Sequence, residues 1–197
     1  MKKCVPLLLL LCLLSSCAEV SDTESTDAPE ATSTKTVRPP GFQPLMGWSS
    51  KTVDGAEFNE TYVKTQAAYM AEHLRPFGWQ YLLLDGEWNA DAIADRESTS
   101  GKRLMDLVDY LHSLDLKVGL QLQALTEPTS AYEKIFQQLA ALKIDHVQMG
   151  GLSQPYQTAV IENIHRAIEQ CGRDIVFSLS AEVPPVRQAE HLQQHVN

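Results

Sequence analysis

The sequence predicts an α/β fold, a partial TIM-type (β/α)8 barrel with about five βα units. Short apolar runs alternate with segments of helical period, and this alternation is typical of a parallel sheet whose strands are joined by helices. A closed barrel of this type has about eight such units in roughly 250 residues, so the chain supplies too few to close one. The runs that predict the strands are 44–48, 79–85, 118–122, 145–149 and 175–179.

Residues 1–17 are predicted to be a signal peptide, because two lysines precede a nearly continuous apolar run and small residues follow it. The run is shorter than the roughly 20 residues that span a bilayer. The segment ends in Leu-Ser-Ser-Cys and resembles a bacterial lipoprotein signal, in which the cysteine is lipidated. We therefore expect a lipid on Cys17 and, because Ala18 follows it, anchoring at the outer membrane. A cleaved signal with an incidental cysteine is the alternative.

The rest of the chain divides into a tether and a folded domain. Residues 18–41 are rich in Ser, Thr, Asp, Glu, Ala and Pro, which predicts a disordered tether before a barrel domain over 42–197. Cys171 is the one cysteine left for that domain, so no internal disulfide is expected. Without the two leader lysines, 14 basic residues remain against 25 acidic ones, a formal charge of −11. This excess of acid argues against a nucleic-acid partner.

Each segment between the expected strands has an apolar stripe with helical spacing. Asn59 is the predicted N-cap of the first helix, and Gly78 and Gly172 are predicted helix ends. A polar loop is expected over 89–101 and a last helix over 186–196. The apolar positions that define the four helices before it are Val63, Ala67, Met70, Ala71 and Leu74; Leu104, Val108 and Leu111; Ile135, Leu139 and Leu142; and Val160, Ile164, Ala167, Ile168 and Cys171.

The carboxyl ends of parallel barrel strands form one mouth, where active sites lie. This rule predicts that Asp85, Gln121, Gly150 and Ser180 lie near one another. The strand within 143–152 runs into two glycines at the position where a catalytic group would be expected. It therefore looks like an active-site strand that lacks its chemistry.

Several motifs, in order and spacing, resemble the catalytic barrel of the alpha-galactosidase (melibiase) family, glycoside hydrolase family 27, especially its bacterial branch. The resemblance covers about 44–197. The motifs are Met46-Gly47-Trp48, Gly78-Trp79-Gln80-Tyr81 leading to Asp85 and Trp88, Asp109 to Ser113 before Leu116-Lys117-Val118-Gly119, and Gly172 to Ser180.

The resemblance implies a retaining mechanism, in which one carboxylate attacks the sugar and a second acts as acid and base. The family's nucleophile stands in a Lys-x-Asp pattern on the fourth strand, and the matching residues here are Gln148, Met149 and Gly150. The family's acid/base aspartate comes from a strand beyond the one that ends at Ser180, and the sequence finishes at Asn197. We therefore expect a truncated barrel with no catalytic residue of the family type.

The resemblance also implies that Trp48, Asp85 and Trp88 contact the sugar. Barrel packing is the alternative role for Trp48, and structural hydrogen bonding is the alternative for Asp85. The family's Met-Gly-Trp-Asn-Ser-Trp here continues after Trp48 as Ser49-Ser50-Lys51, and Gln121 and Ala124 stand where the bacterial branch tends to have His and Arg.

Glu87, Glu127 and Glu182 closely follow predicted strands and are candidate substitute carboxylates; the alternative is that they are solvated loop residues. His146 is interpreted as a core imidazole rather than a ligand. No metal or cofactor is predicted, because no metal-ligand spacing is recognised among His73, His112, His146, His165, His191 and His195.

Three classes of function follow from these observations. The first is a lipoprotein without hydrolase activity that binds a galactoside-type carbohydrate or serves as a scaffold. The second is an active glycosidase that uses the substitute carboxylates, and the third is a non-functional fragment of a longer glycosidase. The expected partners are a carbohydrate, the membrane through Cys17, and either a second copy of the chain or a separately encoded remainder of the barrel.

Overall fold

A computed structural model describes residues 44–50, 59–85, 93, 95, 97–124, 129–152, 155–180 and 184–196. The predicted signal peptide, Cys17 and the predicted tether lie outside these ranges, as do Trp88, Glu87, Glu127 and Glu182. Within the described part, no helix is long and apolar enough to cross a membrane.

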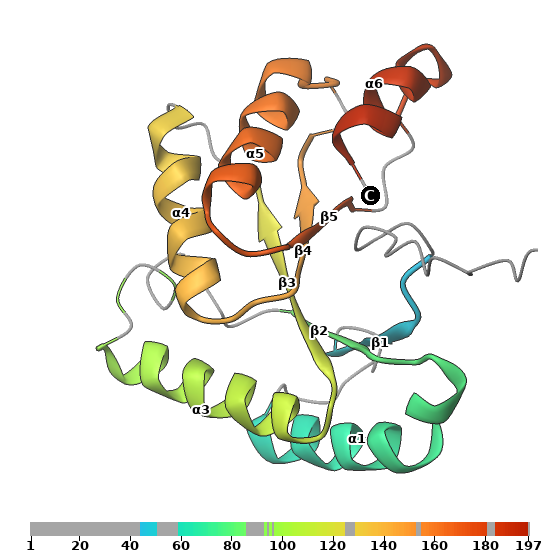
Figure 1. The fold of residues 1–197 in the computed structure, drawn as a ribbon, viewed down its shortest axis with the longest axis vertical. Helices are drawn as coiled ribbons and strands as arrows, with labels where there is room; N and C mark the ends of the chain where they lie inside the picture. Colours follow the sequence, from blue (N-terminus) through green and yellow to red (C-terminus); the bar gives the residue numbers. More distant parts are fainter. Residues whose placement is uncertain are drawn as a thin grey trace, which may run out of the picture. The chain divides into compact units, whose positions relative to one another are not determined.

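The strands form one parallel sheet in the order in which they occur along the chain (Figure 1). They are β1 (Gly47–Ser49), β2 (Tyr81–Leu84), β3 (Lys117–Gln123), β4 (His146–Gly150) and β5 (Val176–Leu179). Consecutive strands that lie side by side and are joined by helices are the arrangement of a barrel wall. The predicted α/β partial barrel is therefore confirmed.

The helices between the strands lie where the apolar stripes predict them. They are α1 (Glu60–His73), α3 (Thr99–Ser113), α4 (Thr129–Ala141) and α5 (Thr158–Gln170). A short 3₁₀ helix, η2 (Arg75–Phe77), follows α1. The last expected helix is divided into a 3₁₀ turn, η3 (Val186–Gln188), and α6 (Ala189–His195).

Alternate strand residues face the helices and form the core. The helix-facing side chains of the strands include Leu82, Leu84, Val118, Leu120, Val147, Met149 and Phe177. They pack with buried residues of the helices, among them Val63, Leu104, Phe136 and Ile164. At about 25 cal/mol per Å² of buried apolar surface, this layer supplies most of the free energy that stabilises the fold. The opposite side of the sheet, which carries Tyr81, Leu83, His146, Gln148 and Ser178, is called the inner face below.

The helix ends show which local predictions hold. The side chain of Asn59 caps α1 by accepting a hydrogen bond of 2.7 Å from the N–H of Tyr62, as predicted. Gly78 is not the end of the first helix, since α1 ends earlier, at His73. With a φ of 93°, Gly78 instead ends the short helix η2. The expected polar loop is shorter than predicted, since Ser98 caps α3 and its helix begins at Thr99.

Two turns use the left-handed conformation without glycine. Asp115 has a φ of 58° and Lys143 a φ of 61°, at the ends of α3 and α4. In each case the next residue, Leu116 or Ile144, donates its N–H to a carbonyl five residues earlier in the helix, which is a Schellman ending. Each turn therefore delivers a buried apolar residue just before a strand begins.

Candidate functional site

Three of the four residues expected at the carboxyl end of the sheet stand at or directly after the end of a strand. Gly150 is the last residue of β4, and Ser180 follows β5 and donates its N–H to the carbonyl of Met149 at 2.9 Å. Asp85 directly follows β2. Gln121 lies within β3, opposite Gln148 and two residues before the pair formed by Gln123 and Gly150. The order of the strands therefore places Gln123, rather than Gln121, beside Gly150.

The space above Gly150 is taken by a neighbouring side chain. A Cβ atom on Gly150 would lie 2.7 Å from Oε1 and 2.8 Å from Nε2 of Gln123. Alternation along β4 gives residue 150 the same orientation as His146 and Gln148, toward the inner face. The amide of Gln123 therefore occupies the position into which a side chain at residue 150 would project.

Asp85 is held at its backbone. Its N–H donates a hydrogen bond of 2.8 Å to Oγ of Ser50, which follows β1. Asp85 is half-buried, so the hydrogen bond joins the ends of two adjacent strands at a site that solvent still reaches. Its predicted contact with a sugar stays a prediction.

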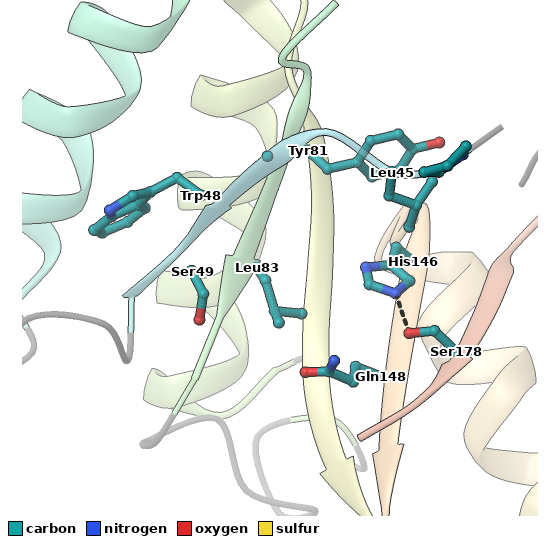
Figure 2. A pocket seen from close by; sticks show the side chains of 10 residues that line it. Leu45, Trp48, Ser49, Tyr81, Leu83, His146, Gln148 and Ser178 are labelled. Atoms are coloured by element: carbon teal, nitrogen blue, oxygen red, sulfur yellow. Dashed lines mark hydrogen bonds between the residues drawn. The ribbon is translucent and has the colours of Figure 1, made fainter. Parts of the chain in front are cut away.

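Trp48 lies on the helix side of the sheet. Its ring centroid is 6.0 Å from that of Tyr62 on α1, and its side chain packs against the core. In Figure 2 the ring points away from His146 and Ser178. These contacts support the packing role that the sequence left open, while the sugar contact stays a prediction.

A cavity of about 320 Å³ opens on the inner face (Figure 2). Nε2 of His146 and Oγ of Ser178 share a hydrogen bond of 2.8 Å across it, and the ring of Tyr81 meets that of His146 edge-on at 6.0 Å. The cavity lies beside β1 and is lined by the first and third residues of β2 and β4 and by Ser178 of β5, whereas barrel sites lie at the carboxyl ends of strands. It corresponds to barrel interior rather than to the candidate site.

His146 is a neutral core residue. Only 6% of its surface is exposed, and burial lowers its pKa to about 4. Its Nδ1 atom is buried against Gly119 and has no hydrogen-bond partner within the described part of the chain. These facts support the interpretation of His146 as a core imidazole. Of its two ring nitrogens, Nε2 has a hydrogen-bond partner, Ser178, and Nδ1 has none among the described residues.

A polar network ties the opposite, amino end of the sheet. The carboxylate of Asp145 accepts hydrogen bonds from Nη2 of Arg173 at 2.6 Å, Nε2 of His112 at 2.8 Å and the N–H of Val118 at 2.9 Å. Burial alone would raise the pKa of Asp145, but these three hydrogen bonds and the charge of His112 outweigh it and hold the pKa below its ordinary value of 3.8. This network holds α3, β3 and the segment before β5 to the start of β4, and it lies at the opposite end of the sheet from the candidate site.

One group of side chains that could hold a metal was not recognised from the sequence. Among the described residues, Glu162, His191 and His195 form a group of close ligand atoms. The spacing of the two histidines, four residues apart in a predicted helix, is a recognisable pattern for one helical face. Their proximity to Glu162 depends on how α6 packs on α5, which no local pattern specifies.

Sequence comparisons identify distant relatives, although no family model matches the chain. The chain is 29% identical over 154 residues to a probable alpha-galactosidase of Dictyostelium discoideum, a match that covers 69% of this chain and 39% of that protein. It is 28% identical over 159 residues to an alpha-galactosidase of Coffea arabica, covering 71% of this chain and 41% of that protein. The chain thus spans about two fifths of the length of these curated relatives.

Solved structures show the same fold. A family 27 β-L-arabinopyranosidase from Geobacillus stearothermophilus superimposes with a TM-score of 0.68 at 26% identity, over 78% of this chain and 52% of that one. A putative alpha-N-acetylgalactosaminidase from Bacillus halodurans superimposes with a TM-score of 0.61 at 24% identity, over 76% and 51% of the two chains. The second match supports the fold alone.

Proposed function

We propose that this chain, which has the fold of glycoside hydrolase family 27 and distant homology to alpha-galactosidases, is an exported lipoprotein that binds a galactoside-type carbohydrate without hydrolysing it. The observation that carries the proposal is the end of β4. The sequence resemblance matches Gly150 to the position of the family's nucleophile, and in the structure the amide of Gln123 fills the space beside it.

Retaining hydrolysis requires two carboxylates about 5 to 5.5 Å apart, one of which forms a covalent bond to the sugar. Glycine has no side chain that could form this bond. At the same end of the sheet Asp85 supplies a carboxylate next to the Ser50 contact. One carboxylate can accept hydrogen bonds from sugar hydroxyls, but it cannot act as both nucleophile and acid.

The names of the relatives suggest the class of sugar. They are alpha-galactosidases, an arabinopyranosidase that was also solved with arabinose, and a putative alpha-N-acetylgalactosaminidase. L-Arabinopyranose has the ring stereochemistry of galactose without its C6 group, so galactose and arabinose are the sugars to test first.

The catalytic part of the proposal is tested with an aryl alpha-galactoside. The full chain is expected to release no aryl alcohol above the uncatalysed rate. Turnover that is abolished by Asp85→Asn or Glu182→Gln would overturn the proposal and assign catalysis to substitute carboxylates, among which Glu87 and Glu127 would be tested next.

The binding part is tested by calorimetry or ligand-observed NMR with galactose, arabinose and glucose. We expect binding of the first two, and at least ~10-fold weaker binding in Asp85→Asn, because a lost charge-assisted hydrogen bond corresponds to about 1.5–3 kcal/mol. Asp115→Asn, an exposed change at the other end of the sheet, is the matched control. Absence of binding to all three sugars would favour a scaffold or a fragment of a longer enzyme.

The lipoprotein part rests on the segment that ends in Cys17. Cys17→Ser is expected to move the protein from the membrane fraction to the soluble fraction, because multiple acyl chains on one cysteine anchor stably whereas a bare protein does not. Cys12→Ser, within the same leader, is the control and should leave the protein at the membrane. Membrane retention of Cys17→Ser would contradict the assignment.

A partner for the sheet is part of the same proposal. Within the described ranges no strand pairs with the outer edge of β1 or of β5, and unpaired strand edges favour association. We expect the full chain to form an oligomer with itself, to bind a separately encoded remainder of the barrel, or to bind the hydrophobic dye ANS. A monodisperse monomer by light scattering, with a cooperative thermal transition and no dye binding, would contradict this expectation.

A further inference from the structure

Helices α5 and α6 bring three potential metal ligands together on one side of the domain. Glu162 lies on α5, and His191 and His195 lie one turn apart on α6, which packs against α5 (Figure 1). One ligand atom from each side chain lies within 4.8 Å of the others. Both helices follow the carboxyl ends of their strands, β4 and β5.

The hydrogen bond of His195 determines which of its nitrogens is free. Its Nδ1 atom lies 2.8 Å from the backbone carbonyl oxygen of His191. Because a carbonyl only accepts, Nδ1 must carry the proton, and Nε2 of the neutral ring keeps its lone pair. The two rings are stacked, with centroids 4.3 Å apart and an angle of 24° between their planes.

His191 is oriented by a tyrosine. Its Nδ1 atom lies 2.8 Å from the hydroxyl of Tyr156, and its Nε2 atom lies 3.3 Å from Oε1 of Glu162. A phenol can donate or accept, so Tyr156 can accept from Nδ1–H and leave the lone pair of Nε2 directed at Glu162. Histidines that bind metals usually donate their second ring N–H to a neighbouring acceptor in this manner.

The spacing suits a small divalent metal ion. Two ligands that are each about 2.0–2.1 Å from a tetrahedral metal lie roughly 3.3 Å apart. The distance between Nε2 of His191 and Oε1 of Glu162 is 3.3 Å, so an ion fits between these atoms as they stand. The side chain of Glu162 is 44% exposed and that of His191 is 16% exposed, which leaves one side of the cluster open to an incoming ion.

We propose that Glu162, His191 and His195 bind a divalent transition metal of the Zn²⁺ class, with Tyr156 as the residue that orients His191. Two imidazole nitrogens and one carboxylate oxygen form a ligand set typical of zinc, and three protein ligands leave a fourth position for water. The bound ion ties α6 to α5. The neighbouring His165 stays outside the ligand set, because it faces Glu169 at 3.5 Å and meets His195 only through ring contact.

The test uses the full chain, purified without a polyhistidine tag and stripped with a chelator. Calorimetric titration with Zn²⁺ should give one ion per chain, and Co²⁺ should give the visible absorption of a four-coordinate site. His191→Ala and His195→Ala should weaken Zn²⁺ binding by at least ~10-fold and remove the Co²⁺ absorption, because each removes one of three ligands. Tyr156→Phe, which keeps all three ligands, should weaken binding by about 10-fold.

His165→Ala and His73→Ala are the matched controls, since each removes a histidine outside the proposed set, and both should bind as the unmodified chain does. Circular dichroism of the metal-free variants separates loss of a ligand from loss of the fold. If an alanine variant fails to fold, Glu162→Gln, on the exposed side of the cluster, provides the same test. No stoichiometric binding by the unmodified chain, or equal losses in ligand and control variants, would overturn the proposal.

Discussion

The two ends of strand β4 differ in what their polar groups do. At the amino end, Asp145 accepts hydrogen bonds from His112, the backbone of Val118 and Arg173, which come from three other segments of the chain. At the carboxyl end the strand finishes on Gly150, which has no side chain and lies under the flexible amide of Gln123.

This difference separates what holds the fold from what the site does. In barrels of this type the amino end of the sheet contributes stability and the carboxyl end carries chemistry. A carboxylate can therefore be absent at residue 150 without loss of the contacts that hold β3, β4 and the segment before β5 together. The comparison predicts that changes near Asp145 affect stability strongly and that changes at Gly150 do not.

The largest effect is expected for Asp145→Ala. This change leaves Arg173, His112 and the N–H of Val118 without their half-buried acceptor. Because a hydrogen bond to a charged group contributes about 1.5–3 kcal/mol, loss of the three together should cost about 3–5 kcal/mol of unfolding free energy. Urea denaturation at neutral pH measures it. Asp115→Asn, which removes the charge of an exposed ion pair with Arg75 and tolerates the left-handed backbone of that turn, should cost less than about 1 kcal/mol. Similar losses of unfolding free energy in the two variants would show that the Asp145 network does not stabilise the fold more than a surface ion pair does.

The next effect is a loss of stability on acidification that originates at His146. Burial lowers its folded pKa to about 4 from the ordinary 6.5, so the unfolded chain binds more protons between these values. The unfolding free energy contributed by this residue therefore falls as pH falls from 6.5 to 4, by up to about 3 kcal/mol.

His146→Gln should flatten the dependence of unfolding free energy on pH over that window. Asp145 acts at lower pH, because its pKa is held below 3.8 and its contribution is lost only as pH falls through the folded pKa. Denaturation curves at several pH values separate the two residues. An unchanged slope between pH 6.5 and 4 in His146→Gln would show that the histidine is not buried as described.

The smallest expected effect is the difference in stability between alanine substitutions at two glycines, Gly119 and Gly150. A Cβ at Gly119 would lie 2.7 Å from Nδ1 of His146 and 3.0 Å from Cδ1 of Leu83, so Gly119→Ala should cost about 1–3 kcal/mol of unfolding free energy. The nearest described atoms to a Cβ at Gly150 belong to the exposed amide of Gln123, which can rotate away, so Gly150→Ala should cost less than about 1 kcal/mol. Thermal unfolding of the two variants, side by side, tests the order; a larger loss at Gly150 would reverse the comparison.

The sequence by itself determined the alternation of strands and helices, the Asn59 cap, the turn at Gly172 and the place of Gly150 at the end of a strand. These features depend on hydrophobic period and local backbone preference, which act over a few residues. It did not predict the left-handed turns at Asp115 and Lys143, because glycine usually occupies such positions.

Only the tertiary structure decided which distant side chains meet. The pairing of His146 with Ser178, the position of Gln123 over Gly150, and the approach of Glu162 to His191 all join residues from different βα units. Their distances depend on strand register and on how helices pack, and register shifts of one residue would turn each strand side chain to the other face. Local sequence patterns specify which face a residue occupies within its own element, whereas contact across elements is set by the packing of the whole core.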